Sequence, residues 1–171
     1  MAECTDELSG ANASLREGSF ERAVEEFTAA LARSPELAGA YRGRALAYIQ
    51  LKRLDEARAD FARARDLDPE DLESWVGLGL SLAMAHEIYP AIGVFETLLA
   101  KHPDYVRGHL QLGLLYYKLC VTSKGRWHLE RALACRPALA ERRQIEEVLQ
   151  EQAKLDHGRY YRPDFAALRA R

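Results

Sequence analysis

The sequence predicts an all-α fold in which pairs of helices stack side by side as a solenoid. Two observations lead to this prediction. Phe27, Phe61 and Phe95 recur at a constant spacing, because 61 − 27 and 95 − 61 are both 34. Four prolines follow the same period, at Pro35, Pro69, Pro103 and Pro137. A fixed period of this size is typical of repeated helix pairs that bury their apolar faces only against their neighbours.

Small and large residues alternate at positions that suit such a stack. Gly79 and Ala91 would let the two helices of one pair approach closely, and Phe95 would fill the gap between one pair and the next. Each proline falls one position beyond a predicted second helix, where a ring that cannot donate a hydrogen bond ends the helix. The prolines are therefore expected to mark helix ends rather than to bind a ligand.

The third repeat carries the residues that point to a known family. Its signature positions hold Trp75, Leu78, Gly79, Leu82, Ala91, Phe95 and Pro103, and only the expected tyrosine is replaced, by Leu82. In these residues the chain resembles the tetratricopeptide repeat (TPR) family. The resemblance covers about residues 4–139 and implies a right-handed solenoid, with repeats at about 4–37, 38–71, 72–105 and 106–139.

The other repeats depart from the family pattern at particular positions. In the first repeat, the first helix has little of the pattern beyond Ala11. In the second, Arg44 stands where a leucine is usual. The fourth has His109 for the tryptophan, Gly125 for the alanine and Leu129 for the phenylalanine. Its second helix is therefore expected to be the weakest of the set.

A capping helix is predicted at about residues 138–156, which would complete a TPR domain over residues 4–156. Apolar residues recur there at helical spacing, and the opposite face is strongly polar. The apolar positions are Leu139, Ile145, Val148, Leu149 and Leu155. A helix of this kind looks like the solvating cap that closes a stack of repeats.

Residues 157–171 are predicted to form a basic aromatic C-terminal tail outside the repeats. Gly158 and Pro163 are expected to interrupt a helix. Aromatic rings alternate with arginines, at Tyr160, Tyr161, Phe165, Arg159, Arg162 and Arg169. Three alternatives stay open: the tail folds back into its own groove or onto the acidic first repeat, docks on another protein, or is flexible.

The resemblance also implies a binding surface, because repeat proteins of this kind bind partners on a concave side lined by the first helix of every repeat. The partner-binding positions expected from the family's geometry are Arg42, Leu46, Gln50, Val76, Leu80, Met84, Arg107, Leu110, Gln111, Leu114, Tyr117 and Lys118. Such an apolar floor is rarely left uncovered unless something binds there. The alternative is that its leucines only complete the packing of the first helices.

Two arginines of this predicted groove, Arg42 and Arg107, could bind a ligand carboxylate or backbone, or could be ordinary solvated charges. Members of the family that grip a C-terminal carboxylate use a clamp of lysines, asparagines and an arginine. Asn12 fits one clamp position, but the others hold Leu8, Gly43, Glu73 and Gly77. Carboxylate capture by such a clamp is therefore disfavoured.

Composition excludes several classes of protein. With 24 basic and 26 acidic residues, the chain has no electrostatic basis for general nucleic-acid binding. The longest uncharged run, from Ser74 to His86, is too short to insert in a membrane, and residues 1–10 are acidic where a secretory signal would be basic. A cytoplasmic location is expected, and an odd number of cysteines argues against a disulfide framework.

The sequence contains no motif that indicates catalysis. The histidines and cysteines match no metal-ligand spacing, and there is no phosphate-binding glycine loop or nucleophile motif. No enzyme activity, catalytic residue, metal or cofactor is therefore expected. Trp75, Trp127 and Met84 are expected mainly to pack.

The function predicted from these features is a non-catalytic protein-interaction module, an adaptor, scaffold or chaperone-like protein that binds a peptide or helix in the concave groove. The alternative is a self-assembling structural protein whose C-terminal tail enters the groove of a neighbouring copy, which would make it a homo-oligomer. A secretion-type TPR chaperone also fits the size, but these repeats are more regular than expected for one.

Overall fold

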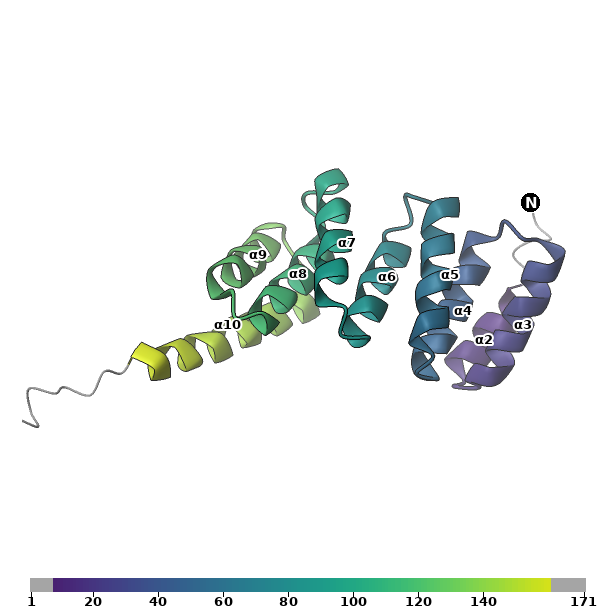
Figure 1. Ribbon diagram of the computed structural model, residues 1–171, viewed down its shortest axis with the longest axis horizontal. Helices are drawn as coiled ribbons and strands as arrows, with labels where there is room; N and C mark the ends of the chain where they lie inside the picture. The colour runs from purple at the N-terminus through teal and green to yellow at the C-terminus, as the bar shows by residue number, and fades with distance from the viewer. Residues whose placement is uncertain (1–7, 161–171) are drawn as a thin grey trace, which may run out of the picture. The chain divides into compact units, whose positions relative to one another are not determined.

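The computed structural model describes residues 8–160, with side chains up to residue 155, and these residues form α-helices joined by short turns, without a β-strand among them (Figure 1). In chain order the helices are α2 (Ser9–Arg16), α3 (Phe20–Arg33), α4 (Ala38–Gln50), α5 (Leu54–Leu67), α6 (Leu72–Met84), α7 (Ile88–Lys101), α8 (Val106–Lys118), α9 (Thr122–Ala134) and α10 (Leu139–Tyr160). The predicted all-α fold of paired helices is confirmed.

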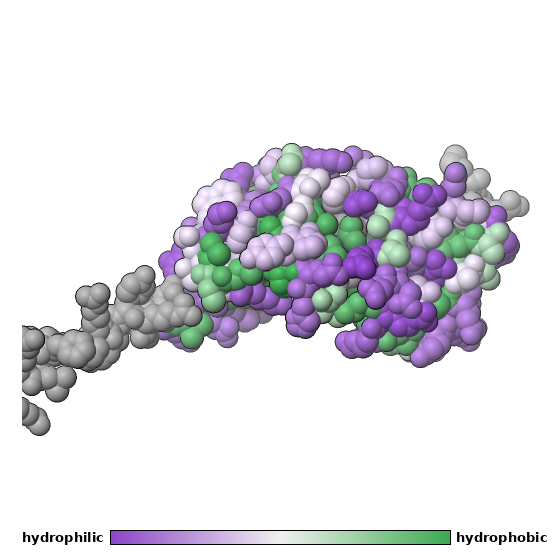
Figure 2. Space-filling view, viewed as in Figure 1, coloured by the Kyte–Doolittle hydropathy of each residue, from purple (hydrophilic) through white to green (hydrophobic). Residues whose placement is uncertain are grey.

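The chain divides into two compact units, Met1–Pro103 and Asp104–Arg171. In the first unit, α2 pairs with α3, α4 with α5, and α6 with α7; between pairs, α3 contacts α4 and α5 contacts α6. In the second unit, α8 pairs with α9, and α10 packs on α9. Figure 2 shows the first unit from the side on which α5 lies in front of α4, and hydrophilic residues cover most of this face.

Helix α10 is longer than predicted, because it continues to Tyr160 instead of ending near residue 156. The expectation that Gly158 would interrupt a helix is wrong, since a single glycine costs a helix only about 1 kcal/mol. Residues 161–171, which hold Pro163 and most of the predicted tail, lie outside the described part of the chain.

The first unit is held together by rings that fill the space above glycines. Phe27 of α3 and Phe61 of α5 are buried, at 0% and 1% exposure. A methyl group on Gly43 of α4 would overlap the Phe27 ring, and one on Gly77 of α6 would overlap the Phe61 ring. Large rings therefore fill the gap between pairs at these two contacts, because only a residue without a side chain lets the next helix come so close. Phe95, the ring predicted to fill such a gap, lies over Gly79 of α6, within its own pair.

The turns inside the pairs repeat as strictly as the core. Gly18, Lys52, His86 and Cys120 recur once per repeat, one position beyond the C-cap of each first helix, and all have positive φ, at 80°, 60°, 63° and 60°. In each turn the next backbone N–H bonds a carbonyl five residues earlier, as Arg53 does with Tyr48 at 2.9 Å. This is the Schellman motif, which favours glycine at the left-handed position. Of these four turns, only the first has a glycine at this position.

A buried ion pair explains the departure at Arg44. Its guanidinium donates to both carboxylate oxygens of Asp60 on α5, at 2.7 and 2.8 Å, and to Thr28 Oγ1 at 3.0 Å. The side chains of Arg44 and Asp60 are only 17% and 9% exposed. The hydrogen bonds that Arg44 donates to Asp60 raise the pKa of Arg44, although burial opposes this. A forked, charge-assisted contact between α4 and α5 thus replaces the usual leucine contact.

Two Gly→Ala substitutions should distinguish the effect of the ring contacts on the free energy of unfolding from the effect of helix propensity. Gly77→Ala is expected to lower the free energy of unfolding by about 1–3 kcal/mol, because the added methyl group overlaps the Phe61 ring. Gly93→Ala, in an exposed part of α7 with no atom within 4 Å of the added carbon, should raise it by about 0.5–1 kcal/mol. Urea unfolding of both variants checks this. Equal effects of the same sign would show that the Phe61 ring sets no constraint.

Removing one member of the buried ion pair should be more harmful than removing both. Asp60→Ala leaves the Arg44 charge buried without its partner and is expected to cost about 3–5 kcal/mol. The double variant Arg44→Leu, Asp60→Ala should recover most of this loss, because leucine is the residue usual at this position. Thermal melting of the wild type, the single variant and the double variant measures the difference. A double variant less stable than Asp60→Ala would contradict this account.

Candidate partner-binding surface

Two first helices of the first unit, α4 and α6, contact each other, and residues one repeat apart occupy equivalent positions on them. Leu46 and Leu80 are one repeat apart, and so are Gln50 and Met84. Leu46 and Met84 are 43% and 40% exposed, Gln50 is exposed, and Leu80 is half-buried. These four residues form what we call the first-helix face.

One end of the first-helix face is polar and held in place. Arg42 lies one helical turn before Leu46 on α4 and donates from a guanidinium nitrogen to Asp71 Oδ1 at 2.7 Å. The other oxygen of Asp71 accepts a hydrogen bond from Ser74 Oγ at 2.6 Å. Arg42, for which a ligand carboxylate, a ligand backbone and solvent were the alternatives, therefore already binds a carboxylate of its own chain. Its side chain stays 40% exposed.

Three of the six predicted groove residues of the second unit pack into an apolar cluster that includes its capping helix. Leu110 of α8 is 2% exposed and lies in one apolar cluster with Leu129, Ala132 and Ile145 of α10. The half-buried residues packed against this cluster include Leu114 and Tyr117 of α8 and Val148 and Leu149 of α10. Helix α10 is therefore the cap that the sequence predicted, and it buries α8 residues assigned to the groove.

The remaining predicted contact residues differ widely in exposure. Val76 is 2% exposed and belongs to the core. Arg107 and Gln111 are half-buried, and Lys118 is exposed at the end of α8. Of the predicted surface, the structure therefore leaves Leu46, Gln50, Met84 and Lys118 well exposed, and only the first three lie together on neighbouring helices.

An aromatic cluster in the second unit was not predicted. Its members are His109 and Tyr116 of α8 and Trp127 and His128 of α9. The Nδ1 atoms of His109 and His128 are 3.0 Å apart, a hydrogen bond between the two rings. His128 stacks on Tyr116 with ring centroids 5.6 Å apart and meets Trp127 edge-on at 4.7 Å. His109, at the position where the family has tryptophan, is 4% exposed.

Two of the three residues expected mainly to pack are instead exposed. Trp75 is 7% exposed and donates from Nε1 to the carbonyl of Pro69 at 3.0 Å, so that prediction is confirmed. Met84 is 40% exposed, and Trp127 is 58% exposed. The signal for Trp127 was in the sequence, because it lies two residues before buried Leu129 and so about 200° around the helix from it.

Two kinds of feature are absent from the described part of the chain. Among its residues no three His, Cys, Asp or Glu side chains gather as a ligand set. None of its helices is long and apolar enough to cross a lipid bilayer.

Comparisons with known proteins agree with the repeat pattern. Residues 8–72 match the family model of the tetratricopeptide repeat. Human tetratricopeptide repeat protein 28 is 28% identical over 102 residues, which are 60% of this chain but only 4% of that protein.

Solved structures match a larger part of the fold. A thermophilic TPR protein of Thermus thermophilus has a TM-score of 0.71 at 23% identity, over 82% of this chain and 78% of that one. The second TPR domain of human RPAP3, in complex with an HSP70 peptide, has a TM-score of 0.62 at 25% identity, over 67% of this chain and 95% of that one. This chain therefore resembles tetratricopeptide repeat proteins, in sequence over residues 8–72 and in fold over its described helices.

Proposed function

We propose that this protein is a non-catalytic interaction module that binds a segment of a partner protein on the first-helix face of its first unit. The observation that carries the proposal is the exposure of Leu46 and Met84, at 43% and 40%, on two helices that contact each other. Large apolar side chains that are exposed as a patch often mark interaction sites, whereas single exposed apolar residues are common. The peptide-bound RPAP3 domain supports a peptide as the kind of ligand.

The face suits an apolar segment with polar groups along one edge. Leu46 and Leu80 would contact apolar side chains of the partner, and Met84, with its flexible thioether, can adapt to their shape. Gln50 and Arg42 would form hydrogen bonds with the partner's backbone or with a polar side chain and so fix its register. Because Asp71 already holds Arg42, little side-chain entropy is lost when the partner binds.

A terminal carboxylate is not the proposed ligand. Two positions where the family's carboxylate clamp has long polar side chains are Gly43 and Gly77. The space above both is filled by the Phe27 and Phe61 rings, so these positions serve the stacking of repeats instead. The proposal is thus an apolar peptide or helix, bound in the cytoplasm, with no role for nucleic acid.

The proposed surface can be tested with charge substitutions at its two exposed residues. Leu46→Glu with Met84→Glu should abolish capture of the proteins that the immobilised wild type retains from cell extract, because two charges would be buried against apolar partner groups. Both sites are partly exposed, so the melting temperature should change little. Leu139→Glu, at a 77% exposed leucine of α10, is the matched control and should capture the same proteins as the wild type.

Identical sets of captured proteins for the wild type and the double variant would contradict the proposal. A loss of capture in the Leu139→Glu control as well would show that added charge, and not the first-helix face, is responsible.

A further inference from the structure

The charges of the chain are divided between its two compact units. Residues 1–103 contain 18 acidic and 11 basic residues, a formal net charge of −7, and residues 104–171 contain 8 acidic and 13 basic residues, a formal net charge of +5. The near-neutral total of −2 therefore hides two opposite charges. A first unit of one copy attracts a second unit of another copy, and this attraction weakens with salt.

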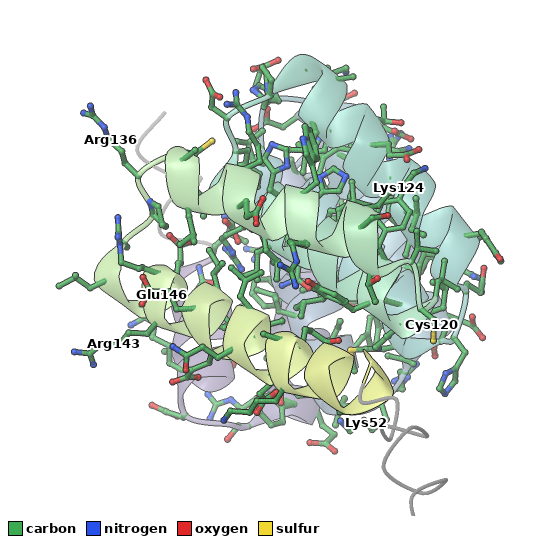
Figure 3. All side chains as sticks on the ribbon, turned by 90° about the vertical axis from the view of Figure 1, so that its left-hand side faces the viewer. Lys52, Cys120, Lys124, Arg136, Arg143 and Glu146 are labelled. Carbon is green, nitrogen blue, oxygen red and sulfur yellow. The ribbon has the colours of Figure 1, made fainter. Side chains whose placement is uncertain are left out.

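The second unit presents an exposed tryptophan between two basic side chains. Lys124, Trp127 and Arg131 of α9 lie at helical spacings of three and four residues and so share one face. All three are exposed, Trp127 by 58%, and Arg131 also donates to Asp104 at 2.9 Å. Figure 3 shows Lys124 near one end of α9 and Arg136 just beyond the other end. We call Lys124, Trp127 and Arg131 the α9 stripe.

The stripe is ordered by contacts beneath it. The Trp127 ring meets His128 at an interplanar angle of 86°, and His128 in turn stacks on Tyr116 and is hydrogen-bonded to buried His109. Lys124 Nζ lies 5.2 Å from the centroid of the Tyr116 ring. An aromatic ring that is held in place before binding loses little entropy on association, and tryptophan is among the residues that dominate binding energy at interfaces.

The densest acidic stretch of the first unit can receive such a stripe. Residues 66–73 contain five acidic residues and no basic one. Asp71 is engaged by Arg42 and Asp66 by Arg65, whereas Asp68 and Glu70 are exposed in the turn between α5 and α6. Asp68 accepts a hydrogen bond from the backbone N–H of Glu70 at 3.2 Å, which orders this turn.

We propose that the α9 stripe of one copy docks on this acidic turn of a second copy. Trp127 supplies the apolar contact, and Lys124 and Arg131 face the carboxylates of Asp68 and Glu70. The contact joins two different surfaces, so each copy keeps one of each free and the chain associates head to tail. It uses neither Leu46 nor Met84, and so it stands independently of the function proposed above.

Sedimentation velocity of the full-length chain, from about 1 to about 100 µM, tests the proposal at low and high salt. The average mass should rise with concentration at low salt, and high salt should reverse this. Trp127→Ala and Lys124→Glu should each weaken self-association about 10- to 30-fold. Tyr89→Ala, at a 75% exposed aromatic residue of α7, is the matched control and should leave it unchanged.

A charge exchange makes the test specific. Glu70→Lys alone should weaken association as Lys124→Glu does, and the double variant Lys124→Glu, Glu70→Lys should restore much of it, because the opposite charges meet again. Of the two tryptophans, Trp75 is buried, so a blue shift of the tryptophan emission on association, which Trp127→Ala should abolish, would report burial of Trp127.

Two results would overturn the proposal. One is a chain that stays monomeric at every concentration and salt level, in which case an acidic segment of another protein would be the ligand of the α9 stripe. The other is self-association that Trp127→Ala and Lys124→Glu both leave intact while circular dichroism shows them folded.

Discussion

The contact between a phenylalanine ring and a glycine of the next helix pair is the constraint on which the first unit depends. Phe27 over Gly43 and Phe61 over Gly77 fix both the distance between successive pairs and their register. The exposed positions of α4 and α6 are brought together as a result, because Leu46 and Leu80 each lie three residues after one of these glycines. The fourth repeat has Gln111 where these glycines stand, and the chain divides into its two units just before this repeat.

Polar contacts add to these ring contacts and differ from one helix pair to the next. The Arg44 pair with Asp60 is a costly substitute for a leucine, since two charges are desolvated, yet the fork of hydrogen bonds fixes α4 against α5 in one geometry. Arg42 and Asp71 link α4 to the start of α6 in a more exposed place. The two neighbouring arginines of α4 thus serve different purposes, one inside a pair and the other beside the proposed binding face.

Much of the fold could be predicted from the sequence, because the constant spacing of the repeats is visible in Phe27, Phe61 and Phe95 and in the prolines that end each second helix. The candidate surface could be predicted only in part. Positional analogy treats Val76 and Leu46 alike, but burial depends on what covers each side chain, and Leu110 is buried in a cluster that includes Ile145 of a helix outside the repeat pattern. The exposure of Trp127 was missed because a large ring was assumed to pack, whereas its place on the polar side of α9 decides the matter.

The left-handed turns have a further consequence for the backbone strain of this protein. Lys52, His86 and Cys120 each keep a side chain in a backbone conformation that disfavours it, although the hydrogen-bonding pattern around them is the same as at Gly18. The chain therefore carries the same small, removable strain at three evenly spaced places. Glycine at these positions would relieve this strain without touching the core, the ion pairs or either proposed surface, at the cost of more conformational freedom in the unfolded chain.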